Sequence, residues 1–324
     1  MNLKAKSNLG IFTSSFQVIN FFELLIKNRL SDKSTLIYIV NSNITDADQL
    51  KRIKIIKDFY RFYPKVFLIK KNIFFIQFFI FLKIIITKYN LIAIGRFFSP
   101  KIFTFLFFRA KAKYIVDDGM EVLDIPKKLK MNSKFNYFFF IFFRKELIKT
   151  KFFTIFKKKF FFKSEKNNFT YLKKKISKKI FSKEIWFIDQ TAFSDIFFDI
   201  KSYLLLIKKI KKKFSRYKFM LILHPTDSNK KKQFLLKKSR INFIKIHQPL
   251  ELYFSTQKVL PAKIISFNST CLLTLSILLK EVKKLKILFV PIDRKYYKTL
   301  QYYKINKKYY DYLGKQTNIS KVLI

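Results

Sequence analysis

Phe219–Pro225 reads FMLILHP, an apolar run without helical periodicity that ends abruptly in histidine and proline. Such a run is typical of a buried parallel strand, whose carboxyl end here presents the imidazole of His224. Pro225 fixes its own φ angle and keeps His224 out of the helical region, so the ring is held in one orientation. Because ligands of open α/β sheets bind beyond the carboxyl ends of strands, His224 is a candidate for chemistry.

A second apolar run has the same form. Residues 112–119 read AKYIVDDG, so this strand ends in Asp117, Asp118 and Gly119. Adjacent carboxylates repel one another and burial disfavours their ionised form, which suits a general base. Gly119 permits a tight turn and the close approach of a ligand. A turn with a helix N-cap would use the same residues, so both interpretations stay open.

Short apolar runs alternate with helical patterns along both halves of the chain, which predicts parallel βαβ units and an α/β fold. Two successive Rossmann-like halves facing one another follow from this order. We expect strands at residues 9–13, 35–40, 66–69, 91–95 and 114–116, then at 184–188, 219–223, 243–246, 263–267 and 285–290.

These patterns divide the chain into four parts. Residues 1–126 form an N-terminal Rossmann-like domain, and residues 184–295 form a second one. Between them, residues 127–183 are rich in lysine and phenylalanine and are predicted to be connecting helices. That segment suits a membrane headgroup layer, although packed helices with a solvated lysine face would show the same pattern. Residues 296–324 are predicted to form a C-terminal helix that could cross back over the first domain.

The composition is strongly basic, with 68 Lys and Arg against 20 Asp and Glu and a net charge of +48. Such a field favours anionic partners, although the codon bias of an AT-rich genome would enrich lysine in the same way. The lone Cys271 allows no internal disulfide and fits a reducing compartment. No convincing signal peptide is found, and the apolar segment Ile73–Ile86 is too short to span a bilayer comfortably.

Two further features follow strands of the second half. Ser269 and Thr270 open a helix, where hydroxyls and free backbone N–H groups make a phosphate site. Plain helix capping would use the same two residues. Glu251 lies in a first helical turn and could bind ribose hydroxyls, or be a surface carboxylate favoured by the helix dipole. The DxD at 46–48 is better explained by capping, so no metal site is predicted.

The order of these motifs resembles that of the bacterial sialyltransferases, which include lipooligosaccharide sialyltransferases and capsular polysialyltransferases. Asp117–Gly119 matches their acidic-acidic-Gly motif, His224–Pro225 their His-Pro motif, and Ser269–Thr270 their Ser-Ser/Thr motif. Leu9–Gln17 looks like their first strand and turn. Trp186–Gln190 looks like the strand that opens their second half.

The resemblance implies a GT-B-like fold, in which two Rossmann-like domains with parallel sheets face a central cleft. It implies inverting transfer of sialic acid from CMP-sialic acid, without a required metal or other cofactor. The acceptor would be a hydroxyl of a cell-surface glycan or glycolipid, such as lipopolysaccharide or capsule. The protein would then be cytoplasmic and in peripheral contact with the anionic inner membrane.

The resemblance also gives roles to residues of this chain. Asp117 or Asp118 would deprotonate the acceptor hydroxyl, and His224 would protonate or stabilise the departing CMP phosphate. Ser269 and Thr270 would hold that phosphate, and Glu251 the ribose. The expected donor-binding residues are Gly119, Pro225, Glu251, Ser269 and Thr270.

Other functions remain open at this stage. One is a GT-B transferase for another nonulosonic acid or another nucleotide sugar. Others are a basic protein that binds nucleic acid and a non-catalytic protein of the membrane surface. Because the aromatic residues lie in apolar runs and no nucleic-acid motif is present, we expect no nucleic-acid partner.

Overall fold

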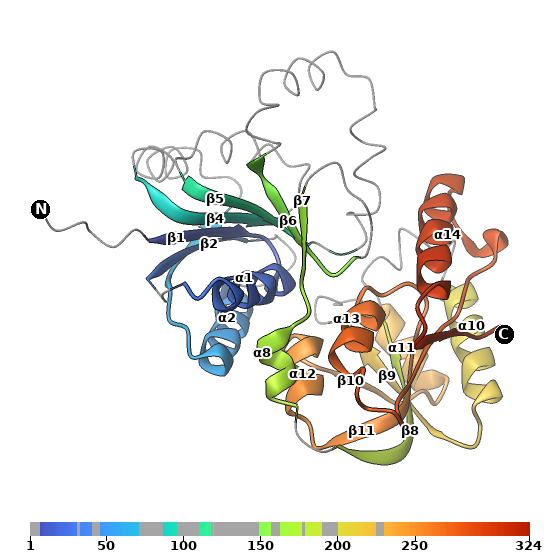
Figure 1. Cartoon of the computed structure of the whole chain (residues 1–324). Coiled ribbons are helices and arrows are strands. Elements are labelled where there is room, and N and C mark those ends of the chain that lie inside the picture. Colours follow the sequence, from blue (N-terminus) through green and yellow to red (C-terminus); the bar gives the residue numbers. More distant parts are fainter. Residues whose placement is uncertain are drawn as a thin grey trace, which may run out of the picture. The chain divides into compact units, whose positions relative to one another are not determined.

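The computed structural model forms two compact units, Met1–Tyr171 and Leu172–Ile324, each built on one sheet (Figure 1). Each unit is described by itself. The described residues are 7–30, 33–40, 46–70, 87–95, 110–117, 119, 149–156, 163–176, 179–189, 200–224 and 230–324.

The sheet of unit 1 is entirely parallel, with strand order β3-β2-β1-β4-β5-β6-β7. The strand order reverses between β1 and β4, as in Rossmann folds, so ligands are expected at this switch point. The strands are β1 (Asn8–Phe12), β2 (Ser34–Val40), β3 (Lys65–Lys70), β4 (Tyr89–Gly95), β5 (Ala110–Val116), β6 (Lys151–Thr154) and β7 (Lys163–Lys166).

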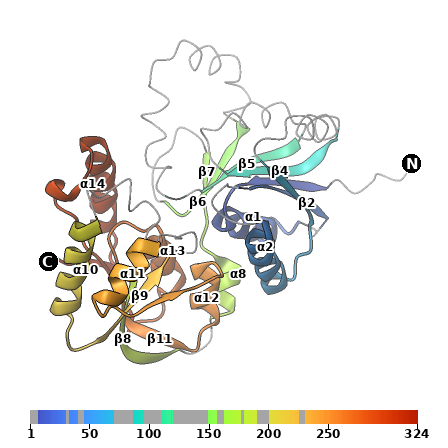
Figure 2. The ribbon, with the colours of Figure 1, turned by 180° about the vertical axis from the view of Figure 1, so that it is seen from behind.

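Helices α1 (Ser15–Lys27) and α2 (Asp46–Tyr60) lie on the same face of this sheet, as Figures 1 and 2 both show. The Ser14 side chain caps α1 by accepting a hydrogen bond from the backbone N–H of Gln17. The two helices meet through aromatic rings, with the Phe22 and Tyr60 centroids 5.4 Å apart. Burial of these aromatic rings stabilises the packing of α1 against α2.

The prediction of connecting helices for residues 127–183 was wrong in part. Its described portion contains β6 and β7, which extend the first sheet, and only one short helix, α8 (Thr170–Lys174). Phe152 and Phe153 are both buried, so both faces of β6 are covered and the strand shows no polar alternation. The rest of the predicted connection, residues 127–148 among them, lies outside the described residues.

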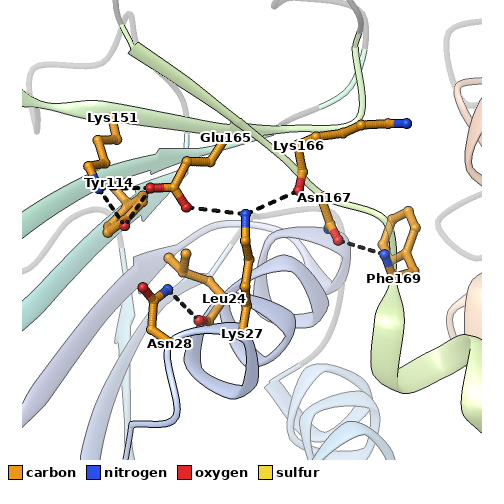
Figure 3. Close-up of polar contacts among 9 residues, drawn as sticks. All are labelled: Leu24, Lys27, Asn28, Tyr114, Lys151, Glu165, Lys166, Asn167 and Phe169. Carbon is orange, nitrogen blue, oxygen red and sulfur yellow. Dashed lines mark hydrogen bonds and ion pairs between the residues drawn. The ribbon is translucent and has the colours of Figure 1, made fainter.

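Strand β7 is attached to the sheet by a charged cluster around Glu165 (Figure 3). Its carboxylate accepts hydrogen bonds from Lys151 Nζ at 2.8 Å, from the Tyr114 hydroxyl at 3.0 Å and from Lys27 Nζ at 3.2 Å. Burial by itself would raise the pKa of Glu165, but these hydrogen bonds lower that pKa below its ordinary value. The cluster therefore holds the last strand against β5, β6 and α1 through the ionised carboxylate.

Unit 2 repeats the architecture, with a wholly parallel sheet in the order β10-β9-β8-β11-β12-β13. Its switch point lies between β8 and β11. The two α/β domains and all ten strands expected from the sequence are confirmed. The strands are β8 (Ile180–Ile188), β9 (Lys218–Leu223), β10 (Phe243–Lys245), β11 (Val259–Ser266), β12 (Lys286–Phe289) and β13 (Ile319–Lys321).

Helices cover both faces of this second sheet (Figures 1 and 2). α10 (Ile200–Lys213) and α11 (Lys230–Lys238) share one hydrophobic cluster, and α12 (Leu250–Thr256) contacts α13 (Cys271–Leu278). Within residues 296–324, where a C-terminal helix was predicted, α14 (Leu300–Gly314) follows a 3₁₀ turn and ends ten residues before the last residue, Ile324. The chain then adds β13 beside β12 within unit 2.

Among the described helices, none is long and apolar enough to cross a membrane. The apolar segment at residues 73–86 lies outside the described residues.

Candidate functional site

His224 directly follows β9, at the carboxyl edge of the second sheet, and its side chain is half-buried. Thr270 lies at the same edge, four residues after the end of β11. Strand β8 lies between β9 and β11. The carboxyl end of β9, which leads to His224, is therefore two strand spacings, roughly 10 Å, from the carboxyl end of β11, where the loop to Thr270 begins. The predicted placement of the imidazole at a strand end is therefore confirmed. Pro225 lies outside the described residues.

The loop after β11 leads into the N-terminus of α13. The Ser269 hydroxyl accepts a hydrogen bond from the backbone N–H of Cys271 at 3.3 Å, as a capping residue does. Thr270 makes no side-chain capping bond, and its side chain is half-buried. The capping interpretation thus applies to Ser269, while the Thr270 hydroxyl lies at the start of a helix whose dipole attracts anions.

α14 supports this loop from a distant part of the chain. The Tyr309 hydroxyl donates a hydrogen bond to the carbonyl oxygen of Ser269 at 2.9 Å. The side-chain amide of Asn306 accepts a hydrogen bond from that of Asn268. Tyr309 and Asn306 are both buried, so these bonds fix the loop. Neither residue was singled out from the sequence, because both look like ordinary positions on a polar C-terminal helix.

Glu251 occupies the first turn of α12, which follows β10 and so also begins at the carboxyl side of the sheet. Its carboxylate accepts a hydrogen bond of 3.1 Å from the hydroxyl of Thr274, one turn after Thr270. Burial raises the pKa of Glu251. The structure thus places Glu251 beside the N-terminal turn of α13. Glu251 is only 8% exposed, so its carboxylate already helps to hold α12 against α13.

The switch point of unit 2 contains two further polar groups. The Ser266 hydroxyl donates to the carbonyl oxygen of Ile188 at 2.7 Å, which ties the end of β11 to the end of β8. Asp189 follows β8, is buried, and accepts a hydrogen bond of 2.9 Å from the hydroxyl of Tyr203. Asp189 thus follows the strand that lies between the strands leading to His224 and Ser269.

In unit 1, the acid pair begins at the end of β5. Asp117 is fully buried, and its carboxylate accepts a hydrogen bond of 2.5 Å from the backbone N–H of Ile155, just after β6. The Asn20 side chain donates to the carbonyl oxygen of Asp117 at 3.4 Å. Gly119 has a φ of 84°, which only glycine adopts readily. Asp118 lies outside the described residues.

A polar stripe on α1 was missed in the sequence. Gln17, Asn20 and Glu23 lie three residues apart on one face of the helix, and all three are buried. Glu23 accepts hydrogen bonds from the Tyr60 hydroxyl at 3.0 Å and from the backbone N–H of Tyr171 at 3.1 Å. The regular spacing of these three polar residues on an otherwise apolar helix could have revealed the stripe from the sequence.

A pocket of about 770 Å³ lies elsewhere in unit 2, and none of the predicted site residues lines it. Its walls come from α10, α14, the loop Pro291–Tyr296 and the chain after β13. Within the described residues, no three His, Cys, Asp or Glu side chains lie close enough to hold a metal ion.

No protein-family model matches the sequence, and a comparison with curated proteins finds no match. Solved structures do match. A putative UDP-N-acetylglucosamine 2-epimerase from Listeria monocytogenes is 10% identical, over 88% of this chain and 79% of its own, with a TM-score of 0.50. The UDP-GlcNAc 2-epimerase from Methanocaldococcus jannaschii, in complex with UDP-GlcNAc and UDP, is 12% identical, over 98% and 89% of the two chains, with a TM-score of 0.50.

A sialyltransferase from Photobacterium damsela is 10% identical, over 98% of this chain and 81% of its own, with a TM-score of 0.48. At such identities a structural likeness shows the fold alone. The two parallel sheets and the matches at 0.50 show a fold of the GT-B type, made of two Rossmann-like domains.

Proposed function

We propose that this chain is a glycosyltransferase that uses a nucleotide-activated sugar, and that its donor is CMP-sialic acid. The observation that carries the proposal is the gathering of three elements at one edge of the second sheet. These are the imidazole of His224, the carboxylate of Glu251 and the hydroxyl-bearing start of α13 at Ser269–Thr270. They complement a leaving phosphate and a ribose, and they follow the motif order of the bacterial sialyltransferases.

The proposed reaction is a single displacement at the anomeric carbon of sialic acid. The acceptor hydroxyl oxygen forms the new glycosidic bond while the bond from that carbon to the phosphate oxygen breaks, with inversion. The hydroxyl proton passes to a carboxylate of the acid pair, and CMP leaves with the bonding electrons. His224 and the N-terminus of α13 stabilise the charge that develops on the phosphate. The transition state has the oxocarbenium character of other glycosyl transfers.

The environment of Asp117 favours different roles for the two acids. Asp117 is inaccessible to solvent and its carboxylate is engaged with the backbone after β6. A base must reach the acceptor hydroxyl within hydrogen-bond distance. We therefore assign the base to Asp118 and a positioning role to Asp117.

The remaining parts of the proposal concern the acceptor and the location. A net charge of +48 attracts a donor that carries both a carboxylate and a phosphate, and it attracts anionic lipid. We propose a cell-surface glycan or glycolipid acceptor, such as lipopolysaccharide or capsule, reached at the cytoplasmic face of the inner membrane. Neither a metal ion nor a nucleic acid is part of the proposal.

A donor panel tests the proposal. The purified chain is incubated with CMP-sialic acid, a CMP-activated nonulosonic acid of another type, UDP-GlcNAc and UDP-glucose, each with lactose and with 3′-sialyllactose. Products are identified by mass spectrometry, with and without EDTA. We expect a sialylated product from CMP-sialic acid only, undiminished by EDTA. Transfer from one of the other donors would contradict the proposal. The absence of transfer from every donor, together with no thermal shift on addition of CMP, would also contradict it.

A further inference from the structure

The pocket of about 770 Å³ in unit 2 is open to solvent and contains no residue of the proposed donor site. Its walls come from α10, α14, the loop after β12 and the chain after β13. Lys209 of α10 and Lys307 of α14 line it and are exposed, so a molecule from solution can reach both. Pockets that bind small ligands have volumes of roughly 300–1,000 Å³, so this one is large enough for a whole small molecule.

Aromatic side chains form part of the pocket wall. Phe289 of β12 and Tyr310 of α14 are buried and stack on one another, with ring centroids 5.9 Å apart and an interplanar angle of 16°. Tyr296 and Tyr303 also line the pocket but are only half-buried, so their side chains keep surface that a ligand can cover. Aromatic walls favour a planar ring, which stacks on them or meets them edge to face.

Cationic side chains surround the same pocket. Six of the lining residues are cationic and two are acidic: Lys209, Arg294, Lys295, Lys307, Lys315 and Lys321 against Asp293 and Asp311. Within the described part of the chain, no carboxylate lies within ion-pair distance of any of the six cations. A hollow lined mainly by one sign of charge concentrates the potential that attracts an anion, and a bound anion relieves the repulsion between the cations.

Part of this positive charge is held in place by the protein. The Nη1 atom of Arg294 donates a hydrogen bond of 2.9 Å to the carbonyl oxygen of Tyr297, which is buried. The guanidinium keeps further N–H groups for a ligand, and its planar fork suits the oxygens of a phosphate. A phosphate monoester carries nearly two negative charges and three acceptor oxygens, so it can use several of these cations together.

We infer that this pocket is a second ligand site of unit 2, and that it binds a nucleoside monophosphate. The phosphate contacts cations of α10 and α14, Lys209 and Lys307 among them, and the base lies against the tyrosine rings. Inorganic phosphate would leave the aromatic wall unused, a neutral nucleoside would leave the cations unpaired, and an acidic glycan or an anionic lipid supplies charge without a planar ring. The inference goes beyond the proposed function and does not depend on it, because the two sites share no residue.

Lysine footprinting tests this site directly. The wild-type chain is acetylated with a limiting amount of an amine-reactive ester, with and without millimolar AMP, and mass spectrometry measures the modification of each lysine. Lys208 and Lys304 are matched controls, because they are exposed on the same two helices and do not line the pocket. We expect AMP to slow the modification of Lys209 and Lys307 at least about threefold more than that of the controls. Equal protection of all four lysines, or protection of none, would overturn the inference.

The same assay tests the chemical class of the ligand. Adenosine and inorganic phosphate, at matched ionic strength, should each protect Lys209 and Lys307 less than AMP does. Protection by inorganic phosphate equal to that by AMP would show that the ring is not recognised, and would overturn the assignment of a nucleotide. Selective protection by oligosialic acid, or by vesicles that contain phosphatidylglycerol, without protection by AMP would overturn it in favour of an acidic glycan or a lipid surface.

A pair of double variants measures the contribution of the cations. Lys209→Gln/Lys307→Gln removes two charges from the pocket, and Lys208→Gln/Lys304→Gln removes the same charge from the same helices outside it. In calorimetric titrations with AMP, the first should bind about tenfold more weakly than wild type, and the second should bind within about twofold of it.

The proposed donor site is unaltered in both double variants, so any AMP that binds there cannot produce a difference between them. Equal affinities of the two variants would overturn the inference. If Lys209→Gln/Lys307→Gln does not fold, the footprint of the wild-type chain decides. Neither readout depends on turnover, so a failure of the proposed glycosyl transfer would leave this test intact.

Discussion

The hydroxyl of Tyr309 donates a hydrogen bond of 2.9 Å to the carbonyl oxygen of Ser269, across 40 residues of sequence. Tyr309 is buried, and burial raises the pKa of its phenol well above the ordinary value, so the hydroxyl stays protonated and can donate at all ordinary pH. α14 therefore fixes the loop that leads into the proposed phosphate site.

Removing that hydroxyl should loosen the loop while the aromatic ring stays packed in the core. We expect Tyr309→Phe to weaken CMP binding about fivefold, because a hydrogen bond of this kind is worth roughly 1 kcal/mol. Tyr302→Phe, an exposed position on the same helix, is the control. Calorimetric titration with CMP measures both variants. Equal affinities for Tyr309→Phe and wild type would mean that α14 does not position the site.

The two acids should respond differently to substitution. Asp117→Ala removes the acceptor for the Ile155 N–H group and should lower the free energy of unfolding by about 2 kcal/mol. Asp117→Asn keeps an oxygen there and should cost less. Asp118→Asn should leave stability unchanged and reduce transfer about 100-fold or more. Urea unfolding and initial rates measure the three variants. A stable Asp117→Ala variant, or a fully active Asp118→Asn variant, contradicts this division of roles.

Glu165 should make the stability of unit 1 depend on pH. Its folded pKa lies below the ordinary value of 4.5, so its contribution is fully present above that pH and is lost as pH falls through the lowered value. We expect Glu165→Gln to cost about 1 kcal/mol at pH 7 and progressively less as the pH falls through the lowered pKa. Urea unfolding at pH 7 and at a series of pH values below 4.5 tests this, with the exposed Glu281→Gln as control. A cost that does not shrink as the pH falls would mean that the ionised form is not what stabilises β7.

Cys271 offers a chemical probe of the site. It lies in the first turn of α13, and burial together with the nearby Glu251 raises the pKa of its thiol well above the ordinary value. We expect the only cysteine to react with a thiol reagent at least about 100-fold more slowly in the native protein than in urea. CMP should slow the native reaction further. Rapid native modification would show that the start of α13 is open rather than packed.

The main framework of the fold could be predicted because its central strands are continuous apolar runs, as parallel strands covered on both faces must be. The missed strands lack that signal. β7 reads KSEK and β13 reads ISK, and each is an edge strand with charged, exposed positions. β6 is short and follows a lysine-rich stretch, so its aromatic residues were taken for part of a helix.

The site shows the same contrast. His224 and Asp117 were identified because a polar residue directly after an apolar strand is a local pattern. Gln17, Asn306 and Tyr309 act through contacts that close only in the folded chain. Their side chains look ordinary in sequence, since nothing local distinguishes a buried polar residue of a helix from an exposed one.

One measurement tests the central claim most directly: the initial rate of sialic acid transfer from CMP-sialic acid by wild type, His224→Ala and His247→Ala. The two histidines are the only ones in the chain, and they follow neighbouring strands of the same sheet, with His247 exposed. The account predicts transfer by wild type and His247→Ala, and a loss of about 100-fold or more in His224→Ala with unchanged melting temperature. Full transfer by His224→Ala, or none by the wild type with any acidic or neutral acceptor, would contradict it.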